Sequence, residues 1–184
     1  MTAWIEMIED GAATGTVKEM YDKARSPHGT IDNVMRCHSL RPHTMAGHLA
    51  LYKSVLHNPD NTLPFWFLEV VASYTSIINN CKYSLTHHFM NARRLINDKE
   101  RSDAIYAALE NHTPEQEFSG KELVLLNYAK KLTASVGKME ASDMEPLRAE
   151  GCTDGEILEV NQVVAYFNYS NRVLNGLGVT TDGD

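Results

Sequence analysis

The sequence lacks any long hydrophobic run, and none of its apolar stretches approaches the roughly 18 residues that span a bilayer. Only three cysteines occur in 184 residues, too few for a disulfide framework, which favours a reducing compartment. Lys and Arg total 17 against 24 Asp and Glu, so the net charge of −7 argues against nucleic acids and anionic membranes as partners. The first residues carry neither a basic nor an apolar export segment, so a cytoplasmic location is expected.

The composition is otherwise that of an ordinary globular protein, with 43% hydrophobic and 22% charged residues. The length and the lack of a linker predict a single domain over residues 1–184. There is no glycine-rich phosphate loop, so no nucleotide cofactor is indicated. Four histidines crowd the early helices, but His43 and His48 are five apart and miss the spacing of two ligands on one helix face. Neither a cofactor nor a metal is therefore expected.

Helical periodicity dominates the chain and predicts an all-α fold. The pattern predicts helices over residues 16–24, 31–38, 42–56, 65–78, 81–96 and 154–175. Three pairs have the spacing of a capping box, in which a Ser or Thr and a Glu satisfy the free N–H groups of a helix start: Ser119 with Glu122, Ser142 with Glu145, and Thr153 with Glu156.

The segment from Glu69 to His88 contains the residues whose side chains could take part in a reaction. Cys81 begins a helix after two asparagines, of which Asn79 or Asn80 is a good N-cap. A thiol in the first turn faces the positive end of the helix dipole, which favours the thiolate. Ser84 and His88 follow at helical spacing, so thiol, hydroxyl and imidazole share one face.

If the chain reverses at Asn79–Asn80, residues 65–96 form a helical hairpin. Glu69 and His88 then lie at nearly the same level, roughly 3 Å apart along the axis. Glu69 can orient His88, and His88 can reach residue 84 or 81, which is the base-and-orienter arrangement of nucleophilic catalysis. Each residue taken singly is more often structural, and the spacing leaves open whether His87 takes the place of His88.

The pattern Glu69-x11-Cys81-x2-Ser84-x3-His88 resembles the Glu-x11-Cys-x2-Cys-x3-His motif of the alkylhydroperoxidase D/carboxymuconolactone decarboxylase family. The stretch 122–132 looks like the later helix of that family, and the tail 164–179 is similar to its peroxidase-related subgroup. The resemblance implies an all-α bundle of helical hairpins, with the motif hairpin at 65–96 and C-terminal helices over 119–179. It also implies a homo-oligomer, for which the aromatic stretch 166–169 offers interface side chains.

One departure from the family motif matters, because its second cysteine is Ser84 here and the usual disulfide is not available. The resemblance implies a peroxidase-related oxidoreductase, in which Cys81 is the redox thiolate and Glu69 and His88 relay protons. Its partners would be a small hydroperoxide and a thiol reductant. An oxidised Cys81 would be resolved by Cys37, by Cys152 or by an external thiol.

Two other functions stay open. One is a lyase or isomerase that acts on a carboxylated small molecule through Glu69 and His88. The other is a non-catalytic oligomeric scaffold. Cys81 is expected to have the lowest thiol pKa of the three cysteines, and peroxide turnover is expected to be weak.

Overall fold

The computed structural model describes residues 2–26 and 28–184, and over these residues it contains helices and turns but no strand. The prediction of an all-α fold is confirmed. The α-helices are α1 (Gly15–Ala24), α2 (Asn33–Arg36), α3 (Pro42–Leu56), α4 (Phe65–Ile78), α5 (Lys82–Ile96), α6 (Lys99–Glu110), α7 (Gly120–Ala134), α8 (Met144–Ala149) and α9 (Asp154–Leu177). Short 3-10 helices lie at Asp10–Ala12, Pro114–Gln116, Val136–Lys138 and Ala141–Asp143.

The chain divides into two compact units. The first unit comprises Met1–Ser54 and Arg172–Asp184, and the second comprises Val55–Asn171. A single domain over the whole chain stays a prediction. No helix in the described part of the chain is long and apolar enough to cross a membrane.

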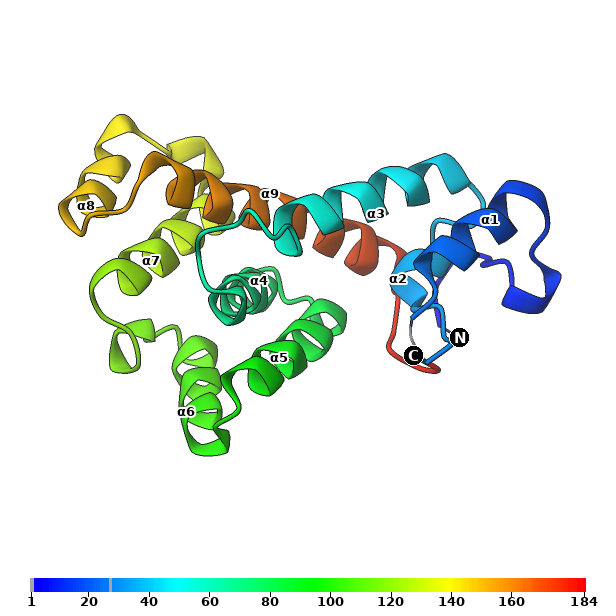
Figure 1. Ribbon diagram of the computed structural model, residues 1–184, viewed down its shortest axis with the longest axis horizontal. Helices are drawn as coiled ribbons and strands as arrows, with labels where there is room; N and C mark the ends of the chain where they lie inside the picture. The colour runs from blue at the N-terminus through cyan, green and yellow to red at the C-terminus, as the bar shows by residue number, and fades with distance from the viewer. Residues whose placement is uncertain (1, 27) are drawn as a thin grey trace. The chain divides into compact units, whose positions relative to one another are not determined.

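The two chain ends meet in the first unit, as the N and C marks in Figure 1 show. The N–H of Thr180 donates to the carbonyl of Thr2 at 2.9 Å. The buried side chain of Asn33 donates to the carbonyls of Thr180 and Asp182, each at 3.0 Å. The hydrophobic core of the first unit is built from Met20, Tyr21, Met35 and Met45, together with the smaller side chains around them.

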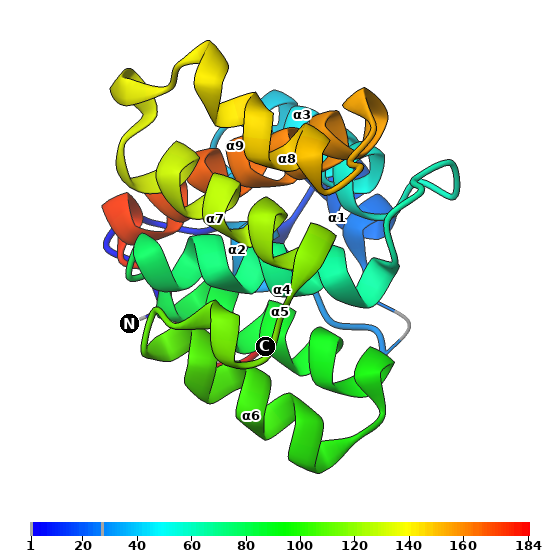
Figure 2. The same cartoon turned by 90° about the vertical axis from the view of Figure 1, so that its left-hand side faces the viewer.

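The second unit is organised around α4, whose residues 67–76 are all buried. In Figure 2, α4 runs across the view, with α7 on one side of it and α5 and α6 on the other. A helix covered from both sides must be apolar nearly all round, which explains why Phe67, Val70, Val71 and Tyr74 lie so close together in the sequence. Its buried polar exceptions are Glu69, Ser73, Thr75 and Ser76.

The turn between α4 and α5 differs from the prediction by one or two residues. Asn79 is the C-cap of α4, Asn80 adopts a left-handed conformation with φ of 52°, and Cys81 itself is the N-cap of α5. Asparagine tolerates the left-handed region better than most residues, so Asn80 makes the reversal rather than capping the next helix. The hairpin at residues 65–96 is confirmed, and an asparagine N-cap for α5 is wrong.

The other helix starts give a mixed result. The Thr153–Glu156 capping box is confirmed, because each residue accepts the N–H of the other. Ser119 is the N-cap of α7, but its side chain makes no capping bond. The box at Ser142 is wrong, because the one formed nearby pairs Glu140 with Asp143. Helix α6 was not predicted, although Asp98 caps it by accepting the N–H of Arg101 at 3.0 Å.

The aromatic stretch at the middle of α9 is mostly internal. Tyr166 and Phe167 are buried in the second unit, whereas Tyr169 is 41% exposed. Of these aromatic side chains, only Tyr169 is exposed enough to contribute to an oligomer interface.

Candidate active site

The centre of the site is a hydrogen bond between the two helices of the hairpin. Glu69 of α4 is 0% exposed, and its Oε2 lies 2.7 Å from Nδ1 of His88 on α5. Its other oxygen, Oε1, accepts from the side chain of Asn91 at 3.2 Å. The prediction that Glu69 and His88 face each other across the hairpin is confirmed.

The carboxylate and a phenyl ring together fix the orientation of His88. When Glu69 is ionised it only accepts, so the proton of the neutral imidazole is on Nδ1, and Nε2 is the nitrogen that can take up a proton. The edge of the Phe167 ring packs against the imidazole, with ring centres 4.5 Å apart and planes at 84°. His87 instead packs on the ring of Tyr83 at 4.7 Å, so His88 is the histidine that pairs with Glu69.

Cys81 is only 1% exposed, and burial raises the pKa of its thiol above the ordinary value. Polar contacts with Ser84, Tyr83 and Asn171 lower the pKa but do not outweigh burial. The backbone N–H groups of Tyr83 and Ser84, in the first turn of α5, are among these contacts. The reasoning that the helix dipole and His88 would make Cys81 acidic is wrong in this respect, because desolvation of the thiolate is the larger effect.

The other two thiols are also raised in pKa by burial, that of Cys37 to about 12. All three cysteines are free and buried. Which of them has the lowest pKa stays a prediction.

Ser84 lies between Cys81 and His88 in sequence, on the same face of α5. It is buried and lies three residues after Cys81 and four before His88. Side chains at these spacings are neighbours on a helix. The order along the hairpin is therefore Cys81, Ser84, His88 and then Glu69 on the facing helix. A thiol, a hydroxyl and an oriented imidazole in that order can transfer a proton to or from sulfur.

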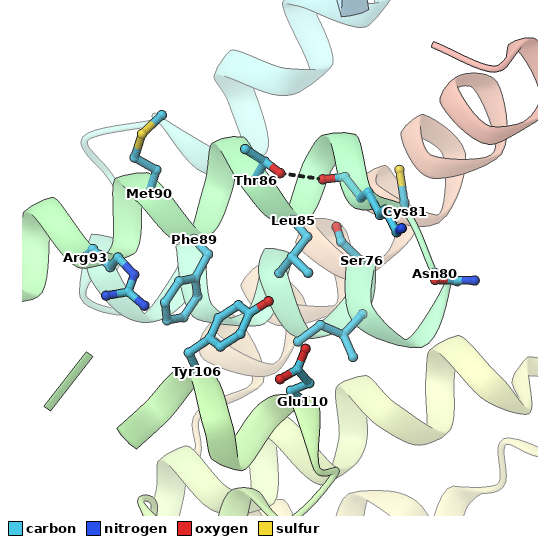
Figure 3. A pocket seen from close by; sticks show the side chains of 12 residues that line it. Ser76, Asn80, Cys81, Leu85, Thr86, Phe89, Met90, Arg93, Tyr106 and Glu110 are labelled. Carbon is cyan, nitrogen blue, oxygen red and sulfur yellow. Dashed lines mark hydrogen bonds between the residues drawn. The ribbon is translucent and has the colours of Figure 1, made fainter. Parts of the chain in front are cut away.

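A pocket of about 700 Å³ lies beside this group, but on a different face of α5. It is lined by Ser76, Ile77, Asn80, Cys81, Lys82, Leu85, Thr86, Phe89, Met90, Arg93, Tyr106 and Glu110. Figure 3 shows Cys81 and Asn80 at one end and Arg93 at the other, with the Cys81 sulfur pointing away from Tyr106. Since each residue turns a helix by about 100°, Thr86 and Phe89 lie on roughly the opposite side from Ser84 and His88.

Cys152 is too far from Cys81 to resolve it. Asn171, which contacts Cys81, lies 17 residues after Asp154 along α9, which is about 25 Å of helix. Cys152 precedes Asp154 at the other end of that stretch. A disulfide needs Cα atoms within about 7 Å, so Cys152 as the resolving residue is wrong for this fold.

Two asparagines of the site were not predicted. Asn91 lies three residues after His88 on the same helix face, so the spacing could have revealed it. Asn171 comes 90 residues after Cys81, and only the tertiary fold brings it there. Among the described residues, no group of three or more His, Cys, Asp or Glu side chains is placed to hold a metal ion.

No protein-family model and no curated protein matches the chain. Among solved structures, it resembles the alkylhydroperoxidase AhpD core of an uncharacterized peroxidase-related protein from Ralstonia eutropha JMP134, with a TM-score of 0.85 and 20% identity over 100% of this chain and 94% of that one. An uncharacterized peroxidase-related protein from Silicibacter sp. TM1040 follows, with a TM-score of 0.81 and 21% identity over 99% and 93% of the two chains.

The debrominase Bmp8 shares the architecture as well, with a TM-score of 0.76 and 13% identity over 100% of this chain and 92% of that one. A cysteine-to-alanine variant of Bmp8 is known in complex with 2,3,4-tribromopyrrole. These likenesses confirm the fold that the sequence motif implies, and they join proteins of different chemistry.

Proposed function

Because the chain has the alkylhydroperoxidase D-like fold, we propose that it is a thiol-dependent oxidoreductase that reduces a small hydroperoxide at Cys81. The observation that supports this most is the hydrogen bond of 2.7 Å between Oε2 of the buried Glu69 and Nδ1 of His88. That pair is oriented by a second carboxylate contact, and its imidazole lies about one helical turn beyond Ser84 and two turns beyond Cys81. The 1% exposure of Cys81 favours a small oxidant over a bulky one.

In the proposed reaction His88 removes the thiol proton, with Ser84 as the group between them. The thiolate of Cys81 attacks the terminal oxygen of the hydroperoxide, the O–O bond breaks, and the departing alkoxide takes the proton from His88. The products are an alcohol and a sulfenic acid on Cys81. Glu69 stabilises the imidazolium that forms between the two proton transfers.

In the proposed route an external thiol, and not Cys37, reduces the sulfenic acid. Ser84 offers no sulfur, and Cys152 is about 25 Å away along α9. The first thiol forms a mixed disulfide with Cys81 and releases water. The second thiol displaces Cys81 and leaves as a disulfide of the reductant. We propose this route in place of an intramolecular disulfide, in a cytoplasmic homo-oligomer.

A second candidate is a lyase or isomerase that acts on a carboxylated lactone. The raised pKa of the Cys81 thiol favours it, because the pair of Glu69 and His88 is complete without the sulfur. In that case the imidazole and the carboxylate do acid–base chemistry alone.

The test is turnover of ethyl hydroperoxide with dithiothreitol, together with dimedone trapping and mass spectrometry of the sulfenic acid. Cys81→Ser should abolish both the turnover and the trapped adduct, and His88→Leu should slow the reaction roughly 100-fold. Cys152→Ser, the matched control for a buried cysteine outside the site, should leave both unchanged. Ser84→Cys should raise turnover, because a thiol at this position can close a disulfide with Cys81.

Peroxide consumption that is equal in the wild type and in Cys81→Ser would rule out the redox function. Release of CO₂ from a carboxylated lactone, retained in Cys81→Ser and lost in His88→Leu, would establish the lyase instead. If neither substrate is consumed by any variant, the fold serves as a scaffold and the proposal is wrong.

A further inference from the structure

Asn171 of α9 is buried beside the turn of the motif hairpin. It is 1% exposed, and its Nδ2 donates to the hydroxyl of Ser76 at 3.4 Å. Its Oδ1 accepts from the side chain of Asn79 at 3.1 Å. The carbonyl of Ser76 in turn accepts the N–H of Cys81 at 2.8 Å. The side chain of Asn171 therefore lies where the end of α4 meets Cys81.

The orientation of this amide is set by its neighbours. The Nδ2 of Asn79 is a donor and lies between two oxygens, that of Asn171 and that of Asn168 at 3.2 Å. An NH₂ donor forms a hydrogen bond with an oxygen and not with another NH₂ group, so the oxygen of the Asn171 amide faces Asn79. The NH₂ group then faces Ser76 and Cys81. Turning the amide over would place two donors against each other in a buried site.

We propose that Asn171 is a positioning residue that donates a hydrogen bond to the deprotonated sulfur of Cys81, and that Asn79 holds the amide in the orientation this requires. The proposal rests on the proposed role of Cys81 as a redox thiolate. It assigns a part in the reaction to a residue outside the motif hairpin. A buried sulfur anion needs hydrogen-bond donors. Asn171 adds a side-chain donor from α9 to the backbone N–H groups of Tyr83 and Ser84 in the first turn of α5.

The electrostatics agree with this geometry. The interaction with Asn171 lowers the pKa of the Cys81 thiol, as those with Ser84 and Tyr83 do, against the opposing effect of burial. Of these groups, only Ser84 and Asn171 act through their side chains, and only they can be altered by substitution. Asn171 is thus one of two side chains that control how much thiolate is present at neutral pH.

The test is a pH titration of the full-length protein, followed by the ultraviolet absorbance of the thiolate and corrected with the Cys81→Ser variant. The informative substitution is Asn171→Asp, which keeps an oxygen for Asn79 and the same shape but replaces the NH₂ group with an acceptor. We expect the midpoint of Cys81 to rise by about one unit or more, which is about tenfold less thiolate at neutral pH. Asn171→Ala should raise it less, because it removes the donor without adding a negative charge.

The matched control is Asn161→Ala, an asparagine of the same helix that donates to Tyr128 at 2.8 Å and is not among the groups acting on Cys81. Its midpoint should equal that of the wild type. Asn171→Ser keeps a shorter donor and should give a midpoint between those of the wild type and Asn171→Ala, which a purely structural role would not produce. Circular dichroism verifies that each variant is folded.

An unchanged midpoint in Asn171→Asp, or an equal rise in Asn161→Ala, would overturn the assignment. The titration needs no peroxide, so it is independent of the proposed activity. A wild type that consumes no peroxide but shows the expected midpoints would contradict the proposed function and leave the role of Asn171 intact. A wild type that is oxidised at Cys81, with no shift in Asn171→Asp, would do the reverse.

Discussion

The hydrogen bond between Glu69 and His88 makes a quantitative prediction about stability. The perturbation is a double-mutant cycle with Glu69→Leu, His88→Leu and the double variant, measured as the free energy of unfolding. Leucine is close to both side chains in volume and carries no polar atom. The single variants each leave a polar partner behind, whereas the double variant removes both.

The expected magnitudes follow from the burial of each partner. His88→Leu leaves a carboxylate that is 0% exposed with Asn91 as its one remaining side-chain partner, which costs about 4 kcal/mol. Glu69→Leu leaves Nδ1 of an imidazole that is 12% exposed, so water satisfies part of it and the cost is about 2 kcal/mol. The double variant loses mainly the bond from Asn91, about 1 kcal/mol.

The double variant is therefore expected to be more stable than either single variant, with a coupling free energy of about 5 kcal/mol. Urea denaturation at pH 7, followed by circular dichroism, gives the four values. Asn161→Ala, which removes a hydrogen bond elsewhere in the second unit, serves as the additive control against His88→Leu. A coupling below about 1 kcal/mol would refute the reasoning, because it would mean that the two groups do not depend on each other.

Three further outcomes are expected. Burial lowers the pKa of His48 from 6.5 to about 4, so between these pH values the unfolded chain binds a proton that the folded state does not. The free energy of unfolding should therefore fall by up to about 3 kcal/mol as the pH drops from 6.5 to 4. His48→Leu should remove most of this loss in thermal melts. Hydrogen bonds from Lys121 and Thr153 lower the pKa of Glu156, so its contribution is present above the ordinary value of 4.5 and is lost at lower pH. Glu156→Gln should cost about 1 kcal/mol at pH 7 and nothing measurable at pH 3 in urea titrations. Because burial raises the pKa of Cys37 to about 12, peptide mapping after maleimide treatment at pH 8 should find this thiol modified only in unfolded protein.

The parts of the site that the sequence predicts are those governed by local geometry. Glu69 and His88 are placed by the rise of two helices and by one turn between them, so counting residues from Asn79–Asn80 was enough. Helix α4 also has the bounds that its periodicity predicts, because Pro64 precedes its first residue and two asparagines follow its last. Local rules fail at the turn itself, where Asn80 is left-handed and Cys81 takes the N-cap conformation expected of an asparagine.

The parts that the sequence does not predict depend on residues far along the chain. The pKa of the Cys81 thiol is set by how much protein surrounds it, and burial from other helices reverses the sign that the helix dipole alone suggests. The contact from Asn171 and the ring of Phe167 against His88 come from α9, about 80 to 90 residues later, and no spacing rule connects them to the motif. Helix α6 was missed because its hydrophobic positions are few and its start depends on one aspartate.

The same energetics bear on whether the fold is only a scaffold. A buried carboxylate paired with an imidazole gives no more stability than two well-packed apolar side chains of the same volume, because the desolvation of the charged groups offsets their attraction. Apart from Ser73, the residues of α4 around Glu69 are apolar, so leucine at that position would suit the helix and its neighbours. A chain that used this hairpin for assembly alone would gain nothing from the pair. Its presence, with Asn91 holding the second oxygen and Phe167 holding the ring, favours a site in which the imidazole must keep one orientation and one tautomer.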